Sequence, residues 1–251
     1  MEFCNQDVCE EAPLKIKKNI YYQPVVNAAA SDVLFYESLL RFVGEDGEVF
    51  PPSPFVHRAE ADGSIAALDA ESLSIVFKML VDNPCLSLSL NVSCLSLDHP
   101  LWILRFYEGA KASPDILSRL IVEITETRNF VLSPEACHRL RHIQSMGVRL
   151  ALDDVDHVPF SCLQARLKSH DFPVDFLKIS RHLTMDLHKS PHHRGQFSDL
   201  LDLAHEYGLI PIIEGVETKS QCDALCAKGL VVQQGYYWGH PASVLKTTLS
   251  S

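Results

Sequence analysis

The chain has 251 residues, of which 47 % are hydrophobic and 22 % charged, which is typical of a globular protein with a full hydrophobic core. Its formal net charge of -10 argues against general adhesion to DNA or to anionic membranes. No uncharged apolar run reaches membrane-span length, and residues 1–18 lack the apolar core of a signal peptide. We therefore expect a cytoplasmic protein whose partners include neither DNA nor a membrane.

The chain begins with a polar arm, residues 1–18, and then alternates between strand-like and helix-like stretches. Eight apolar stretches have strand character: Asn19–Val26, Val33–Phe42, Leu86–Ser93, Leu120–Thr125, Val148–Val155, Asp175–Ser180, Leu209–Gly215 and Leu230–Trp238. Helical spacing follows most of them, as in Ser133–Met146, Gln196–Tyr207 and Thr218–Ala227. This alternation predicts a mainly parallel sheet in an α/β fold, and eight units in this length fit a (β/α)8 (TIM) barrel.

The first connection differs from the others. Only Asn27–Asp32 separates the first two strands, which is too short for a crossover helix. The first strand should therefore run antiparallel to the second. No linker or break in composition divides the rest, so residues 19–251 are predicted to form one domain.

The stretch Val148–Asp154 ends in two adjacent carboxylates, Asp153 and Asp154. Neighbouring residues on a strand point to opposite faces, so two adjacent acids suit the end of a strand, where both can turn toward one polar site. A divalent cation would offset their repulsion. The alternative is an acidic N-cap on the helix that follows the strand.

Polar residues recur in the other predicted strands. They are Glu37, Asn91, Glu123 with Glu126, Lys178, Glu214 and Gln234. In a barrel the carboxyl ends of the strands converge on one face, where active sites are built. Carboxylate and amide oxygens select hard cations such as Mg²⁺ or Mn²⁺, and two such cations can clamp a phosphodiester. The pattern therefore favours a metal site over the capping alternative.

With these residues assembled, the sequence from about Ile20 to Pro241 resembles the EAL domain family, bacterial phosphodiesterases that linearise cyclic di-GMP to pGpG. The matching motifs are Tyr22-Gln23-Pro24, Glu37-Ser38-Leu39-Leu40-Arg41, Asn91-Val92-Ser93, Glu123-Ile124-Thr125-Glu126, Asp153-Asp154, Leu177-Lys178-Ile179, Glu214-Gly215-Val216-Glu217 and Gln234-Gly235-Tyr236. The resemblance implies an EAL-type modified TIM barrel with one antiparallel strand.

The resemblance also implies roles for individual residues. One cation would be held by Glu37, Asn91, Glu123 and Asp153. A second cation, bridged by Asp153, would be completed by Asp154 and Glu214.

Lys178, Glu214, Gln234 and Glu37 are implied as catalytic residues: Lys178 would hold the attacking water or a phosphate oxygen, Glu214 is a candidate base, and Gln234 would orient substrate or water. Gln23, Leu39 and Arg41 are implied to bind the nucleotide.

Three residues keep a simpler alternative. Arg41 could form a surface ion pair, Glu126 could support a loop, and Glu217 could be an acid in the first turn of a helix.

Two departures from the family pattern fall on the same half of the site. The family sequence Asp-Asp-Phe-Gly-Thr-Gly is replaced by Asp153-Asp154 followed by Val155–Pro159, which removes two glycines and their backbone freedom. The family's Lys-Ile-Asp is replaced by Lys178-Ile179-Ser180. In the family this loop supports the second metal and contributes to the dimer contact.

Three functions follow as hypotheses. The first, which we favour, is a phosphodiesterase that uses two Mg²⁺ or Mn²⁺ ions, because every aligned ligand position is filled. The second is a receptor that binds cyclic di-GMP without significant turnover, because of the altered loop and Ser180. The third is a protein-interaction module. No sensory domain accompanies the motifs, so we expect any input to arrive through a regulatory protein partner, the expression level or the polar arm. The expected partners also include a second copy of the chain in a homodimer.

Overall fold

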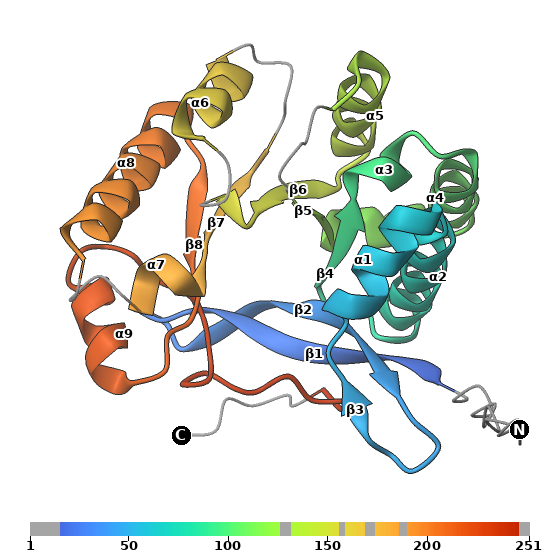
Figure 1. Ribbon diagram of the computed structural model, residues 1–251, viewed down its shortest axis with the longest axis horizontal. Helices are drawn as coiled ribbons and strands as arrows, with labels where there is room; N and C mark the ends of the chain where they lie inside the picture. The colour runs from blue at the N-terminus through green and yellow to red at the C-terminus, as the bar shows by residue number, and fades with distance from the viewer. Residues whose placement is uncertain (1–15, 126–131, 156–158, 169–173, 186–189, 246–251) are drawn as a thin grey trace, which may run out of the picture.

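The computed structural model describes residues 16–125, 132–155, 159–168, 174–185 and 190–245. Within these residues the strands close into a barrel and the helices pack around its outside (Figure 1). The hydrogen-bonded order is β1-β9-β8-β7-β6-β5-β4-β2, and pairing of β2 with β1 closes the ring. The short strand β3 pairs with β2 outside the ring. The α/β barrel predicted from the sequence is confirmed.

The strands are β1 (Lys17–Asn27), β2 (Asp32–Val43), β3 (Val49–Phe50), β4 (Leu88–Ser93), β5 (Leu120–Thr125), β6 (Arg149–Asp153), β7 (Phe176–Ile179), β8 (Ile210–Ile213) and β9 (Val232–Gln234). The helices are α1 (Ser53–Asp62), α2 (Ile65–Asp82), α3 (Cys94–Leu97), α4 (Pro100–Ala112), the 3₁₀ helix η1 (Pro114–Arg119), α5 (Pro134–Ser145), α6 (Phe160–Lys168), α7 (Arg181–Met185), α8 (Pro191–Tyr207) and α9 (Lys219–Cys226).

The antiparallel first strand is also confirmed. β1 pairs antiparallel with β2 from Lys17↔Val43 to Asn27↔Asp32, and antiparallel with β9. The other pairs in the ring are parallel. Because β1 begins at Lys17, the last two residues of the predicted polar arm belong to the barrel, and residues 1–15 lie outside the described part of the chain.

Each predicted strand is present, but several boundaries differ. The largest difference is at β9, which ends at Gln234 and not at Trp238. A Cβ on Gly235 would lie 2.1 Å from the Val216 carbonyl oxygen, so the backbone passes close to its neighbour there and leaves the sheet. Strand β3 was not predicted, since two residues carry no pattern. Helix α8 begins at Pro191, earlier than predicted, because Ser190 caps it and the proline suits its first turn.

Side chains that point into the barrel form two layers. The lower layer, which we call the apolar floor, consists of Val25, Phe35, Ile121, Ala151, Phe176 and Ile212. These side chains are at most 3 % exposed. Inward-pointing residues on a strand are two positions apart, so the next layer is displaced by two residues along each strand. This polar layer consists of Gln23, Glu37, Asn91, Glu123, Asp153, Lys178, Glu214 and Gln234.

A second, larger core lies between the barrel and its helices. It includes Trp102 and Phe106 of α4 and Leu73 of α2, all fully buried. Figure 1 shows α2 and α4 on one side of the barrel and α8 and α9 on the other. Burial on both faces explains why the strands are continuous apolar runs in the sequence. Among the described helices, none is both long enough and apolar enough to cross a membrane.

Candidate functional site

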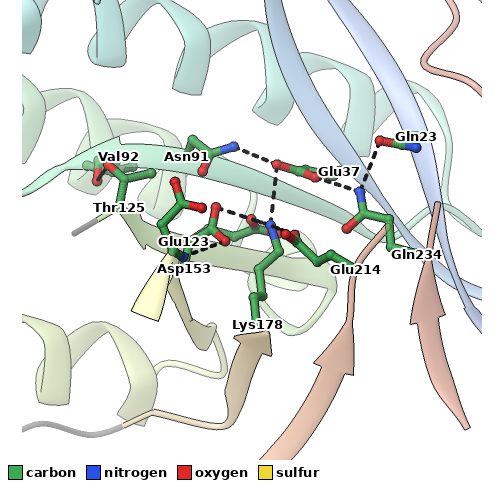
Figure 2. Close-up of polar contacts among 11 residues, drawn as sticks. Gln23, Glu37, Asn91, Val92, Glu123, Thr125, Asp153, Lys178, Glu214 and Gln234 are labelled. Atoms are coloured by element: carbon green, nitrogen blue, oxygen red, sulfur yellow. Dashed lines mark hydrogen bonds and ion pairs between the residues drawn. The ribbon is translucent and has the colours of Figure 1, made fainter. Parts of the chain in front are cut away.

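Lys178 of β7 lies at the centre of the polar layer, where its ammonium group is surrounded by carboxylates (Figure 2). Its Nζ is 2.6 Å from Glu123 Oε2, 2.9 Å from Glu214 Oε1, 3.2 Å from Asp153 Oδ2 and 3.5 Å from Glu37 Oε1. Glu37 lies within β2, Glu123 within β5 and Asp153 at the end of β6, and Glu214 directly follows β8. The site holds four carboxyl groups and one ammonium group, so it can accept further cations when the carboxyl groups are ionised.

Burial and mutual repulsion shift the pKa values of these groups. Burial raises the pKa of Glu123 to about 8 and that of Asp153 to about 6, although the Lys178 ammonium opposes both shifts. Burial also raises the pKa of Glu214 well above its ordinary value. The pKa of Lys178 is raised, because its four carboxylate neighbours outweigh the effect of burial.

Glu37 behaves differently because it accepts two amide hydrogen bonds. Asn91 Nδ2 donates to its Oε1 at 2.8 Å, and Gln234 Nε2 donates to its Oε2 at 2.6 Å. These bonds and the Lys178 charge outweigh burial and lower the pKa of Glu37. Gln234 Nε2 also donates to Oε1 of Gln23 at 3.3 Å, so this one nitrogen connects Gln23 to Glu37.

Three buried oxygens of the polar layer accept no hydrogen bond among the described residues. They are Glu123 Oε1, Asn91 Oδ1 and Gln234 Oε1. A buried oxygen without a partner is unfavourable by roughly 1–3 kcal/mol, and several in one layer call for a common explanation. Carboxylate and amide oxygens are the ligands of hard divalent cations, so this donor set fits such an ion.

Two groups of carboxylates can each hold one cation. Glu37, Glu123 and Asp153 form the first group, and Asp153, Asp154 and Glu214 form the second, with ligand oxygens in each group within 4.8 Å of one another. Asp153 belongs to both groups. Asp154 adopts φ 51°, a left-handed conformation that is uncommon outside glycine, and its N–H donates to Asp153 Oδ1. This backbone turn lets both acids face one site.

A cavity of about 260 Å³ opens above the polar layer. Its inner wall is formed by Gln23, Glu37, Asp153, Lys178, Glu214 and Gln234. Its rim includes Arg181, Glu217 and Tyr236, none of which we predicted as a site residue. Tyr236 and Glu217 belong to motifs that match the family, but no motif or spacing in the sequence marked Arg181 as a site residue. Its place at the cavity depends on the fold, which brings the start of α7 beside the end of β8.

The remaining predicted residues lie elsewhere. Leu39 and Arg41 follow Glu37 on the same face of β2 but do not line the cavity. Arg41 Nη1 donates to the Leu40 carbonyl at 2.8 Å, and its guanidinium lies 6.0 Å from the centre of the Tyr21 ring. Glu126 lies outside the described residues. The interpretation of Glu217 as a first-turn acid is wrong, because Thr218 is the N-cap of α9 and Glu217 precedes it.

The two departures from the family pattern follow the ends of β6 and β7 in the sequence. Ser180, which follows β7, is buried, and its hydroxyl has no hydrogen-bond partner among the described residues. Of the altered loop, residues 156–158 lie outside the described part of the chain, and helix α6 follows at Phe160.

The sequence is similar to a known protein family and to known bacterial proteins. A family model described as the EAL domain matches residues 12–241. An uncharacterized signaling protein of Caulobacter vibrioides is 31 % identical over 232 residues, covering 92 % of this chain and 28 % of the relative. The cyclic di-GMP phosphodiesterase PdeL of Escherichia coli is 27 % identical, covering 88 % of this chain and 61 % of PdeL. The chain thus spans less than two thirds of either relative.

Solved structures show the same fold. The PaMucR phosphodiesterase, solved as a c-di-GMP complex, superposes with a TM-score of 0.77 at 24 % identity, over 90 % of this chain and 92 % of that one. A standalone EAL protein of Vibrio cholerae in its c-di-GMP-bound form superposes with a TM-score of 0.69 at 21 % identity, over 95 % and 96 % of the two chains.

Proposed function

The chain belongs to the EAL domain family, and from this premise we propose that it hydrolyses cyclic di-GMP to linear pGpG with two bound Mg²⁺ or Mn²⁺ ions. The observation that carries the proposal is the pair of carboxylate groups that share Asp153. Two divalent cations at such a site would neutralise the phosphodiester and lower the pKa of an attacking water.

The residues around these groups then have distinct tasks. Lys178 reaches the centre of the polar layer and would hold the attacking water or a phosphate oxygen by hydrogen bonds. Glu214 lines the cavity, and its side chain is 18 % exposed and lies 2.9 Å from Lys178 Nζ, so it would accept the water's proton. Gln234, fixed by Glu37 and Gln23, would orient water or substrate.

The test is to incubate the purified protein with cyclic di-GMP and excess Mn²⁺ or Mg²⁺ and to follow pGpG by chromatography. Asp153→Ala removes one ligand from both carboxylate groups and should abolish product. Asp199→Ala, which truncates an exposed carboxylate on α8, is the matched control and should remain active. Equal product from the Asp153→Ala sample would contradict the proposal and indicate a contaminating enzyme.

A second candidate function is a receptor that binds cyclic di-GMP and acts through a protein partner with little turnover. Ser180 favours it, since a buried hydroxyl to which no described residue is hydrogen-bonded stands where the family has a carboxylate. In the same experiment, this candidate predicts no pGpG together with calorimetric binding of cyclic di-GMP.

A further inference from the structure

The charges around the cavity pose a problem for a substrate with two phosphates. The cavity is lined by four carboxylates, namely Glu37, Asp153, Glu214 and Glu217. The only lysine or arginine side chains among the described lining residues are Lys178 and Arg181. Lys178 already lies within 3.5 Å of four carboxylates, so its charge is largely offset. A cyclic dinucleotide brings one phosphate to the cations and a second that needs its own positive partner.

Arg181 has the position and the free donors for this role. Its Nη2 donates to Glu217 Oε1 at 2.6 Å, and its Nε lies 3.0 Å from the Met185 sulfur. The guanidinium lies 5.5 Å from the centre of the Tyr236 ring, and that ring stacks on His240 with centroids 4.1 Å apart. No described residue accepts a hydrogen bond from Nη1, which leaves this nitrogen for a ligand on the cavity side.

The backbone fixes Arg181 relative to the catalytic carboxylates. Gly215, directly after Glu214, has φ 71°, and a Cβ there would lie 2.4 Å from Arg181 Cγ and 2.9 Å from Arg181 Cα. The start of α7 therefore packs against the turn that carries Glu214, and only glycine permits this contact. As a result, the fold holds the backbone and the first side-chain carbons of Arg181 next to the residue that follows Glu214.

The ion pair with Glu217 does not prevent ligand binding. The Arg181 side chain is 51 % exposed and that of Glu217 is 30 % exposed, so water screens the attraction between the two charges and the pair holds Arg181 only weakly. A phosphate oxygen would accept a charge-assisted hydrogen bond from Nη1 while the guanidinium stays 5.5 Å from the centre of the Tyr236 ring.

We propose that Arg181 is a specificity-determining residue that binds the non-scissile phosphate of a cyclic dinucleotide. This inference rests on the proposed function, since it assigns the second phosphate of that substrate. It predicts that Arg181 selects dinucleotides over phosphodiesters that carry a single phosphate.

The experiment compares wild type with Arg181→Gln, Arg181→Lys and Glu217→Gln. KM and kcat are measured with Mn²⁺ for cyclic di-GMP and for bis(4-nitrophenyl) phosphate, a small phosphodiester with one phosphate. We expect Arg181→Gln to raise KM for cyclic di-GMP about tenfold with kcat changed less than about threefold, and Arg181→Lys to recover part of the loss. The preference for cyclic di-GMP over the small diester should fall about tenfold.

Glu217→Gln separates ligand binding from a structural role of the ion pair. It breaks the same ion pair but keeps the guanidinium, so KM for cyclic di-GMP should stay equal or fall. Glu217→Gln could instead raise KM as much as Arg181→Gln does. In that case Arg181 only forms a structural ion pair that connects α7 to the turn before α9, and the inference is overturned. An equal loss on both substrates in Arg181→Gln overturns it as well.

The proposed function and this inference can fail separately. If wild type produces no pGpG, the hydrolytic function fails, and the calorimetric Kd for cyclic di-GMP then takes the place of KM. Weaker binding by Arg181→Gln than by wild type and Glu217→Gln supports the inference for a receptor. Equal binding by all variants, or none by wild type, overturns it.

Discussion

The apolar floor and the polar layer lie only two residues apart on the strands that they share, but they differ in polarity, charge and hydrogen bonding. In the floor the Phe35 and Phe176 rings lie 5.9 Å apart, and each side chain is buried among carbon atoms. In the polar layer one lysine is surrounded by four carboxylates, and three buried oxygens have no hydrogen-bond partner among the described residues. Two residues along a strand amount to about 7 Å.

This difference gives the two layers opposite effects on the free energy of folding. The floor closes the barrel and gains free energy from burial, whereas the polar layer holds repelling charges at a cost in free energy. Substitutions in the two layers should therefore affect different measurements.

The largest expected effect is that of Lys178→Met on the polar layer. It removes the ammonium that contacts four carboxylates, so hydrolysis of cyclic di-GMP should fall by roughly 1,000-fold. Lys219→Met, which removes a lysine that is exposed and paired with Asp223 on α9, should keep wild-type activity. Both variants are compared in steady-state kinetics with excess Mn²⁺. Full activity of Lys178→Met would remove Lys178 from the mechanism.

The second prediction concerns the floor. Phe176→Ala leaves a cavity beneath Lys178 and should lower the free energy of unfolding by about 3–5 kcal/mol, measured by urea denaturation. The folded fraction should retain hydrolysis within about tenfold of wild type, because no group of the polar layer is removed. Phe160→Ala, at an exposed position on α6, should cost less than about 1 kcal/mol. A catalytic loss as large as that of Lys178→Met would contradict the separation of the layers.

The third prediction concerns pH and metal. The pKa of Asp153 is about 6 and that of Glu123 about 8, both above the ordinary value near 4. The folded state therefore binds protons more tightly than the unfolded state, and the metal-free protein should lose stability as pH rises from about 5 to 8. Glu37, with a lowered pKa, and Lys178, with a raised one, change charge outside this window.

Addition of millimolar Mn²⁺ at pH 8 should reverse this loss, because cations take the place of the protons, and should raise Tm by about 5 °C. Thermal unfolding in EDTA and in Mn²⁺ at three pH values measures both effects. Asp153→Asn should flatten the pH profile and reduce the Mn²⁺ shift. A stability that rises with pH in EDTA would show that the carboxylates are not held protonated by burial.

The smallest expected effect comes from restoring the family pattern after Asp154 and at position 180. Ser180→Asp, combined with a glycine-bearing loop in place of Val155–Pro159, should raise the turnover of cyclic di-GMP a few-fold, because it adds a carboxylate and restores backbone freedom. Steady-state kinetics of the double change and of Ser180→Asp alone measure the gain. No gain would mean that these departures do not limit the rate.

The sequence by itself determined the order and type of the barrel strands. Continuous apolar runs mark strands buried on both faces, and the short connection Asn27–Asp32 forced an antiparallel first strand. The recurrence of polar side chains in these runs also identified the residues of the polar layer except Gln23, which only the resemblance to the EAL family supplied. The boundary of β9 could not be predicted, since the close approach of Gly235 to Val216 is a contact between distant segments.

Only the tertiary structure decided which of these residues act together and what completes the site. Sequence spacing cannot show that Lys178 reaches four carboxylates at once, or that Leu39 and Arg41 fall outside the cavity that Gln23 lines. It also could not reveal Arg181, whose position depends on α7 packing against the turn at Gly215. Local patterns encode strands and motifs because they depend on neighbouring residues, whereas a site depends on distances between strand ends that only barrel closure fixes.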